Sequence, residues 1–258
     1  MTPATTRTIS GLTISQRVGG EGHPLLMLHG WGADSSLLWP LAERLLPLGY
    51  RVYAPDLPGF GSSAPPPAVW SVHEYAAFVL DYMQAHGLDK VYLFGHSFGG
   101  RLGLVLGAQQ PQRIYKMVLA DSAGVRPTAS AQAQFRLNVY KTLRDGLRAA
   151  GLKRLSEKLR AWYAARYGSA DYKAAGALRE TFVRVVNEDL LPYAARVQVS
   201  TLLLWGEKDA DTPLWQGQTL AKTIPDAGLV VLPGAGHYSY LDALAHTVTV
   251  IDYFYKQP

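Results

Sequence analysis

Three residue types that together support nucleophilic catalysis occur at separate points of the chain. Ser97 lies in "GHSFGG", between Gly95 and Gly99, and chance alone predicts only about 0.1 matches to G-x-S-x-G in a chain of this composition. His237 lies in the glycine-rich segment "PGAGHYSYLD", and Asp209 lies in "GEKDAD". A serine hydroxyl becomes a nucleophile when a base removes its proton, and an imidazole base needs an acid that holds its tautomer and stabilises its cation. The residues predict Ser97 as nucleophile, His237 as base and Asp209 as acid.

The elements around these residues have the pattern of an α/β protein. Short apolar runs alternate with longer segments of helical periodicity, which is typical of β-α units on a mostly parallel sheet. We expect an antiparallel hairpin over 8–17 and strands over 24–29, 50–56, 91–95, 116–121, 201–206 and 229–232. We expect helices over 37–46, 72–86, 98–110, 214–223 and 238–255. Because the carboxyl ends of parallel strands meet at one edge, the three residues should meet there.

The middle of the chain departs from this alternation. Residues 125–197 have helical spacing and no convincing strand, and they contain 14 Lys and Arg against 6 Asp and Glu. The segment therefore predicts a helical cap, inserted into a core domain formed by residues 1–124 and 198–258. A positive charge of this size is usually a solvated helix face.

Five segments, taken together and in this order, resemble the α/β-hydrolase superfamily over essentially the whole chain. They are "LLMLHGWG", "DLPGFGSS", "GHSFGG", "LLLWGEKDADTP" and "GAGHYSYLD". The chain order of serine, acid and histidine is also the order in that family. The resemblance implies an α/β-hydrolase fold, with a mostly parallel eight-stranded sheet flanked by helices and an inserted helical cap. It also implies an oxyanion hole made by the backbone N–H groups of Trp31 and Phe98.

The acid has two alternatives. The family places it at the fourth position of a G-x-x-D turn, which is Asp209, but Asp211 lies two residues further on. Asp121 ends a neighbouring strand, where some members of the family carry the acid. Spacing alone leaves the choice open, and Asp209 is the preferred assignment.

The resemblance implies a carboxylesterase-like serine hydrolase that forms an acyl-enzyme intermediate. A compact cap of about 70 residues favours esters of short or medium acyl chains, and we expect Tyr140, Trp162, Tyr163 and Tyr238 in the substrate pocket. One alternative is a carbon-carbon bond hydrolase of ring-cleavage diketones. Those enzymes usually have Asn where this chain has His96, and Trp where it has Tyr238. The other alternative is a ligand-binding member of the fold with little turnover.

The amino-acid composition and the motifs exclude several other kinds of functional site. The chain has no cysteine, which rules out disulfides, thiolate metal sites and a cysteine nucleophile. The remaining histidines show no metal-ligand spacing, so we expect no metal and no cofactor. The sequence shows no nucleic-acid recognition motif, and we expect no leader peptide and no membrane span. We expect a cytoplasmic monomer or homodimer that acts on a small-molecule ester, without nucleic acid and without stable membrane association.

Overall fold

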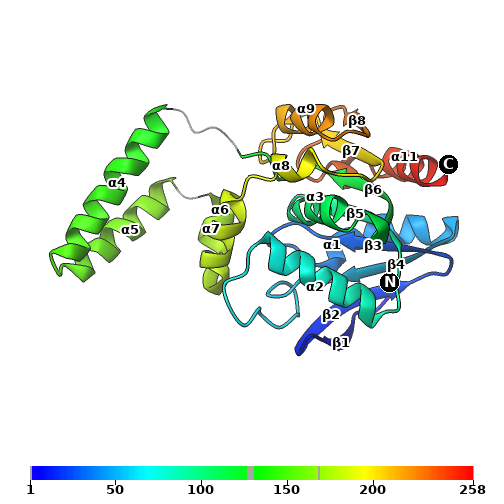
Figure 1. Ribbon diagram of the computed structural model, residues 1–258, viewed down its shortest axis with the longest axis horizontal. Coiled ribbons are helices and arrows are strands. Elements are labelled where there is room, and N and C mark those ends of the chain that lie inside the picture. The colour runs from blue at the N-terminus through cyan, green and yellow to red at the C-terminus, as the bar shows by residue number, and fades with distance from the viewer. Residues whose placement is uncertain (1, 127–130, 168, 258) are drawn as a thin grey trace.

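A single eight-stranded sheet forms the centre of the molecule (Figure 1). The computed structural model describes residues 2–126, 131–167 and 169–257. The spatial order of the strands is β1-β2-β4-β3-β5-β6-β7-β8. Pairing is antiparallel between β1 and β2 and between β2 and β4, and parallel across the rest of the sheet. The strands are β1 (Thr5–Ile9), β2 (Leu12–Gly19), β3 (His23–Leu28), β4 (Tyr50–Pro55), β5 (Val91–His96), β6 (Ile114–Ala120), β7 (Thr201–Gly206) and β8 (Ala227–Leu232).

The predicted mostly parallel sheet is therefore confirmed, and so is the N-terminal hairpin. Ser10 and Gly11 join β1 to β2 with φ of 48° and 78°. Two successive residues with positive φ make the kind of turn that matches the twist of an antiparallel hairpin. Each predicted strand is found with its ends within two residues of the expected position.

Helices pack on both faces of the sheet (Figure 1). The first turn of α2 is closed by a capping box, in which Ser71 and Glu74 each accept from the other's backbone N–H, satisfying two otherwise unpaired donors. The side chain of Asp34 caps α1 by accepting from the Ser36 N–H. The core helices are α1 (Ser35–Leu45), α2 (Val72–Ala85), α3 (Phe98–Gln109), α9 (Leu214–Thr223), α10 (Ser239–Asp242) and α11 (Leu244–Lys256), with short 3-10 turns at η1 (Leu46–Leu48) and η2 (Pro111–Arg113).

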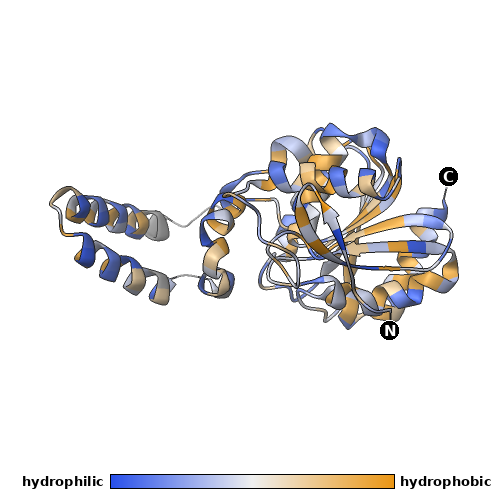
Figure 2. Cartoon of the chain, turned by 90° about the horizontal axis from the view of Figure 1, so that it is seen from below, coloured by the Kyte–Doolittle hydropathy of each residue, from blue (hydrophilic) through white to orange (hydrophobic). Residues whose placement is uncertain are grey.

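The side chains of each strand point alternately to the two faces of the sheet, which gives the core two layers. In β3, Leu26 and Leu28 face the layer formed with α2, α3 and α9, while Leu25 and Met27 face the layer formed with α1 and α11. Successive side chains of a strand point to opposite faces, so a central strand covered by helices on both sides must be apolar throughout. Figure 2 shows the apolar residues concentrated in the strands and on the sheet-facing sides of the helices.

The predicted helix over 238–255 is two helices in the structure. Ala243 separates α10 from α11 with φ of −118° and ψ of 41°, outside the helical region. The apolar spacing continues across Ala243 because both helices pack on the same layer through Tyr240, Ile251 and Tyr255. Periodicity therefore could not reveal the break.

Five helices and a 3-10 turn lie between β6 and β7, and the described part of this segment contains no strand. In Figure 1, α4 and α5 form a hairpin that extends away from the sheet, while α6 and α7 lie between this hairpin and the core. The elements are α4 (Ala131–Ala149), α5 (Lys153–Tyr167), α6 (Ala170–Ala174), η3 (Gly176–Leu178), α7 (Arg179–Asn187) and α8 (Leu191–Ala194). The domain limits at 125 and 197 stay a prediction. In the parts of the chain that the structure describes, no helix is both long enough and apolar enough to span a bilayer.

The turn from β5 into α3 is a tight crossing, at which backbone segments approach each other closely. A Cβ on Gly99 would lie 2.1 Å from the Leu28 carbonyl oxygen, and one on Gly95 would lie 2.6 Å from the Gly99 carbonyl oxygen. Both neighbours are backbone atoms, which cannot rotate away as a side chain can. Ser97, between them, has φ of 49°, a conformation that costs a residue with a side chain about 1–3 kcal/mol. The two glycines of G-x-S-x-G are therefore required by contact with β3 and α3.

We expect Gly99→Ala to lower the free energy of unfolding by about 1–3 kcal/mol, since overpacking against backbone forces the helix to shift. Chemical denaturation of the purified protein measures it. Gly146→Ala is the matched control, and we expect it to leave the free energy of unfolding unchanged or to raise it. A Cβ on Gly146 in α4 meets nothing within 4 Å, and alanine is the better helix former. Equal unfolding midpoints for the parent and Gly99→Ala would contradict the close contact.

Candidate active site

The backbone around Ser97 is held by the sheet and leaves the hydroxyl at the surface of a cavity. The Ser97 N–H donates to the Ala120 carbonyl (3.0 Å), and the Ser97 carbonyl accepts from the Ala123 N–H (3.1 Å). These bonds tie the turn to the end of β6. Ser97 itself is half-buried and lines a cavity of about 360 Å³. Within the described residues its hydroxyl makes no hydrogen bond.

His237 and Asp209 form a hydrogen-bonded pair. His237 Nδ1 lies 2.9 Å from Asp209 Oδ2, and the carboxylate is fully buried while the ring is 15% exposed. The Asp211 and Thr212 N–H groups donate to Asp209 Oδ1 (2.8 and 2.9 Å), and the Thr212 hydroxyl lies 2.6 Å from Oδ2. The carboxylate is thus fixed, and it selects the tautomer with the proton on Nδ1, leaving Nε2 able to accept one.

The electrostatics of the pair suit a general base. Burial by itself lowers the pKa of His237, but the hydrogen bond and the negative charge of Asp209 outweigh it and place the pKa above its usual value. Burial by itself raises the pKa of Asp209, but hydrogen bonds from His237 and Thr212 outweigh it and place that pKa below its usual value. Asp209 is therefore ionised at neutral pH and stabilises the imidazolium.

The two alternative acids make other contacts. Asp121 accepts from the Gly206 N–H (2.8 Å), the Ser239 N–H (3.1 Å) and the Ser239 hydroxyl (2.5 Å). Its burial raises its pKa to about 7, and it joins the end of β7 to the segment after His237. Asp211 is exposed at the cavity. Of the three carboxylates, Asp209 is the one hydrogen-bonded to the His237 ring.

The two residues predicted to supply the backbone donors of an oxyanion hole also lie at this cavity. Trp31 and Phe98 line the cavity with Ser97. Neither backbone N–H donates a hydrogen bond to any group in the part of the chain that the structure describes. The loop that carries Trp31 is braced by His29, which accepts from the Leu57 N–H at Nε2 (2.9 Å) and contacts the Gly30 carbonyl at Nδ1 (2.7 Å).

His96 braces the other side of the site. Its Nε2 lies 2.8 Å from the His237 carbonyl oxygen, so this nitrogen carries the proton and donates. Burial, followed by the proximity of His237, lowers the pKa of His96 to about 3, and the ring is neutral. Its Nδ1 is buried without a partner among the described residues. His96 therefore holds the backbone of His237 and takes no part in the Asp209 pair.

The four predicted pocket residues are divided between two places. Tyr238 lines a smaller hollow of about 140 Å³ next to Ser97 and His237. Tyr140, Trp162 and Tyr163 line a separate hollow of about 260 Å³ that includes neither. Tyr140 and Tyr163 stack on each other, with ring centroids 4.1 Å apart, since they face one another across the α4–α5 hairpin. The structure therefore does not bring these three side chains to Ser97.

Further residues from α3, α7 and α9 line the Ser97 cavity. From α7, Phe182, Val185 and Val186 line the Ser97 cavity, and Phe182 packs edge-on against Trp31 with ring centroids 5.0 Å apart. Arg101 and Gln216 also line it. Arg101 could have been found from its position one helical turn after Ser97, whereas the α7 residues and Gln216 reach the cavity only through the tertiary fold.

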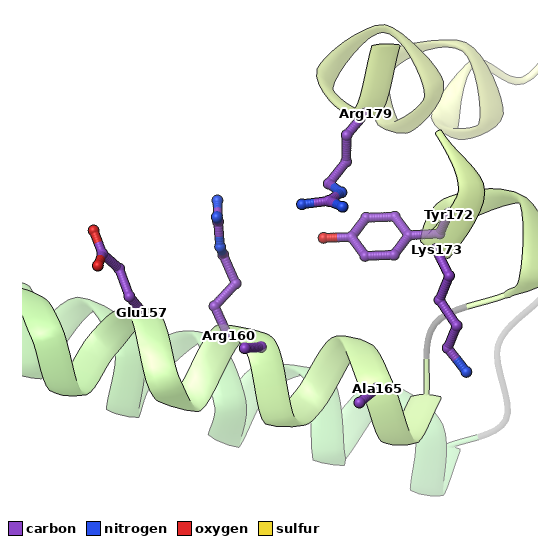
Figure 3. Close-up of a pocket in the computed structure, with 7 residues that line it drawn as sticks. Glu157, Arg160, Ala165, Tyr172, Lys173 and Arg179 are labelled. Atoms are coloured by element: carbon purple, nitrogen blue, oxygen red, sulfur yellow. The ribbon is translucent and has the colours of Figure 1, made fainter. Parts of the chain in front are cut away.

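Other groupings of polar side chains lie at and away from this cavity. Asp209, Asp211 and His237 have ligand atoms within 4.8 Å of one another, but the His237 bond and the Thr212 contacts already engage Asp209. A metal-free site stays a prediction. Figure 3 shows a hollow of about 470 Å³ between α5 and the α6–α7 segment, where Arg179 lies over the Tyr172 ring. Neither Ser97 nor His237 lines it.

Several curated relatives of the chain carry the names of hydrolases, esterases or lipases. It is 28% identical over 251 residues to a 2-hydroxy-6-oxo-6-phenylhexa-2,4-dienoate hydrolase of Burkholderia cepacia, covering 90% of this chain and 87% of that protein. It is 29% identical over 237 residues to a pimeloyl-(acyl-carrier protein) methyl ester esterase of Chromobacterium violaceum, covering 86% and 90%. It is 27% identical over 240 residues to lipase 1 of Psychrobacter immobilis, covering 88% and 74%.

Solved structures share the fold over nearly the full length. An esterase from Exiguobacterium antarcticum superposes with a TM-score of 0.76 at 24% identity, covering 99% of this chain and 100% of that one. A meta-cleavage product hydrolase from Pseudomonas fluorescens superposes with a TM-score of 0.74 at 23% identity, covering 97% of each. Residues 186–257 match the family described as TAP-like protein. Residues 23–192 match the family described by the alpha/beta hydrolase fold, and the chain belongs to this family of hydrolases.

Proposed function

We propose that the protein is a serine hydrolase that cleaves carboxylic esters of short or medium acyl chains. The observation that carries this proposal is the Asp209–His237 hydrogen bond of 2.9 Å, at a cavity that also contains the Ser97 hydroxyl and the Trp31 and Phe98 residues. Nucleophile, oriented base and candidate oxyanion donors therefore meet at one place, which is the arrangement that acyl transfer requires.

In the first half of the reaction, His237 Nε2 takes the proton of Ser97 as the serine oxygen bonds to the ester carbonyl carbon. The carbonyl oxygen becomes an oxyanion, and the N–H groups of Trp31 and Phe98 donate to it. His237 then gives the proton to the departing alcohol oxygen, which leaves an acyl group on Ser97. In the second half, water replaces the alcohol and the same steps release the carboxylic acid. Asp209 keeps the imidazole oriented throughout.

The cavity supports the choice of acyl length. About 360 Å³ lies near the small end of the range for small-molecule sites. Side chains of α7 close one side of it through Phe182 and Val185. We propose that the α6–α7 segment is the part of the cap that covers Ser97, so that the cap limits how long an acyl chain can enter.

A carbon-carbon bond hydrolase is the second candidate, favoured by the Burkholderia cepacia relative. The same nucleophile and base would serve both reactions. Against it, His96 stands where those enzymes usually have Asn, and Tyr238 where they have Trp. A ligand-binding member with little turnover is the third candidate, and an activity test separates all three.

We expect purified protein to hydrolyse 4-nitrophenyl acetate to hexanoate in preference to the palmitate, and to be labelled by a fluorophosphonate. Ser97→Ala should lose at least about 10³-fold in kcat/KM and all labelling. Ser200→Ala, at the opposite end of β7, is the control and should match the parent. Turnover of a ring-cleavage diketone without ester turnover would favour the second candidate. Labelling without turnover would favour the third.

Asp209→Asn tests the acid. The amide cannot stabilise the imidazolium and favours the wrong tautomer, so we expect kcat to fall by about 10³–10⁴-fold. Asp211→Asn should lose less than about tenfold, because Asp211 lies at the cavity without bonding the ring. Steady-state kinetics on one ester, with unfolding curves to verify folding, make the comparison. Near-normal kcat in Asp209→Asn would overturn the assignment.

The pH dependence tests the base. His237 accepts a proton only when neutral, and the raised pKa of its ring in the free protein means that kcat/KM should fall on the acid side with a midpoint above 6.5. Without the Asp209 charge, burial dominates, so the midpoint should move to lower pH in Asp209→Asn. Profiles of kcat/KM from about pH 5 to 9 measure both. A midpoint of the parent's kcat/KM profile below pH 6.5, the usual pKa of histidine, would contradict the Asp209–His237 hydrogen bond.

A further inference from the structure

Arg101 is a buried cation in the wall of the Ser97 cavity. It lies in the first turn of α3, four residues after Ser97, which directly precedes the helix. The side chain is only 5% exposed and lines the cavity with Ser97 and Phe98.

The guanidinium has no carboxylate within ion-pair distance among the described residues. Its one hydrogen bond to a described group runs from Nη1 to the Glu188 carbonyl oxygen (3.0 Å), and it forms no ion pair with a described carboxylate. The negative charges of Glu188 and Asp189 act on Arg101 without direct contact, and each carboxylate accepts a hydrogen bond from another group. The Glu188 carboxylate accepts from the Val72 N–H (3.1 Å), and the Asp189 carboxylate accepts from the Leu191 N–H (3.2 Å).

An arginine in this position keeps its charge. Burial lowers the pKa of Arg101 to about 10, so the side chain is protonated at neutral pH. Arginine is rarely buried without a paired anion, since a buried charge is costly unless it is compensated. Of its five N–H donors, four remain after the bond to Glu188, and the cavity is where an anion could meet them.

Gln216 is a second buried polar side chain in the cavity whose hydrogen-bonding groups are unused within the described residues. Gln216 is 3% exposed and lines the cavity, and its amide makes no hydrogen bond to any group in the ranges that the structure describes. The remaining lining near Arg101 includes Val125, Val185 and Val186. A charge-bearing donor and an amide in a largely apolar wall are the features of a site that fixes one polar end of a ligand.

Two negative side chains of the site extend to a second hollow. Asp171 and Asp211 line both the cavity and the small hollow beside Tyr238 and His96, whereas Arg101 lines the cavity and does not line that hollow. An anionic substrate group is repelled there and attracted to Arg101. We infer that the substrate is an ester whose acyl part ends in a carboxylate, and that Arg101 binds this carboxylate while Ser97 attacks the ester. This inference rests on the proposed ester hydrolysis.

Monomethyl glutarate and dimethyl glutarate test the inference, because they share the acyl chain and the scissile ester and differ in charge. Methanol release gives kcat/KM for each. We expect the parent to prefer the monomethyl ester by at least about tenfold, and Arg101→Gln to lower this preference ratio by about 10–100-fold, which is the value of a hydrogen bond to a charged group.

Arg101→Lys keeps the charge without the planar fork and should retain part of the preference. Arg113→Gln is the matched control, because Arg113 also donates to a backbone carbonyl, that of Leu88 (2.9 Å), but does not line the cavity; its ratio should equal that of the parent. Equal kcat/KM of the parent for both esters, or an unchanged ratio in Arg101→Gln, would overturn the inference. A purely structural role would lower both rates and leave the ratio unaltered.

Binding of glutarate separates this inference from the proposed function. Calorimetry on Ser97→Ala should detect glutarate, with a Kd at least about tenfold weaker in Ser97→Ala/Arg101→Gln. If the parent cleaves neither these two esters nor 4-nitrophenyl acetate while glutarate binds through Arg101, ester hydrolysis is wrong and the carboxylate site stands. If the parent cleaves dimethyl glutarate and Ser97→Ala does not bind glutarate, ester hydrolysis stands and the carboxylate site is wrong.

Discussion

The close passage of α3 over β5 and β3 constrains everything around the cavity. Gly99 packs its Cα against the Leu28 carbonyl and donates its N–H to the His29 carbonyl (3.0 Å). Ser97 then has to adopt a positive φ, and the bonds of its backbone to Ala120 and Ala123 hold that conformation against its cost. Because the turn is so short, the side chain of Ser97 has no room inside the core and lies at the cavity.

Polar groups at the carboxyl edge of the sheet fall into two sets. Asp121, Asp209, His29 and His96 each have backbone or side-chain partners that join one loop to another. These groups stabilise the positions of the loops, since a buried polar atom without a partner costs about 1–3 kcal/mol. The other set has donors that the described chain leaves unused and that border the cavity. It comprises the N–H groups of Trp31 and Phe98 and the side chains of Arg101 and Gln216.

The cavity is electrostatically uneven, which bears on how a substrate would lie in it. Arg101 is a cation on the α3 side of the cavity, while Asp171 and Asp211 line both the cavity and the hollow near Tyr238. The proximity of Asp211 adds to burial in raising the pKa of Asp171, as expected for like charges. In such a field, a ligand with one charged end has one favourable orientation. The α7 side chains that close the cavity are apolar, so they contribute shape and exclusion of water.

The sequence by itself determined the sheet, the core helices, and the places of Ser97, Asp209 and His237 at strand ends. These follow from periodicity and from glycine spacing, which are local properties of the chain. It left the choice of the catalytic acid open among Asp209, Asp211 and Asp121. Periodicity also predicted one continuous helix where the structure has two helices separated by Ala243. Only the tertiary structure showed that Asp209 bonds the His237 ring while Asp121 bonds Gly206 and Ser239. It also placed Tyr140 and Tyr163 against each other and brought Phe182 to the cavity. Hydrogen bonds and packing between distant segments depend on how the elements dock, and spacing along the chain carries no information about docking.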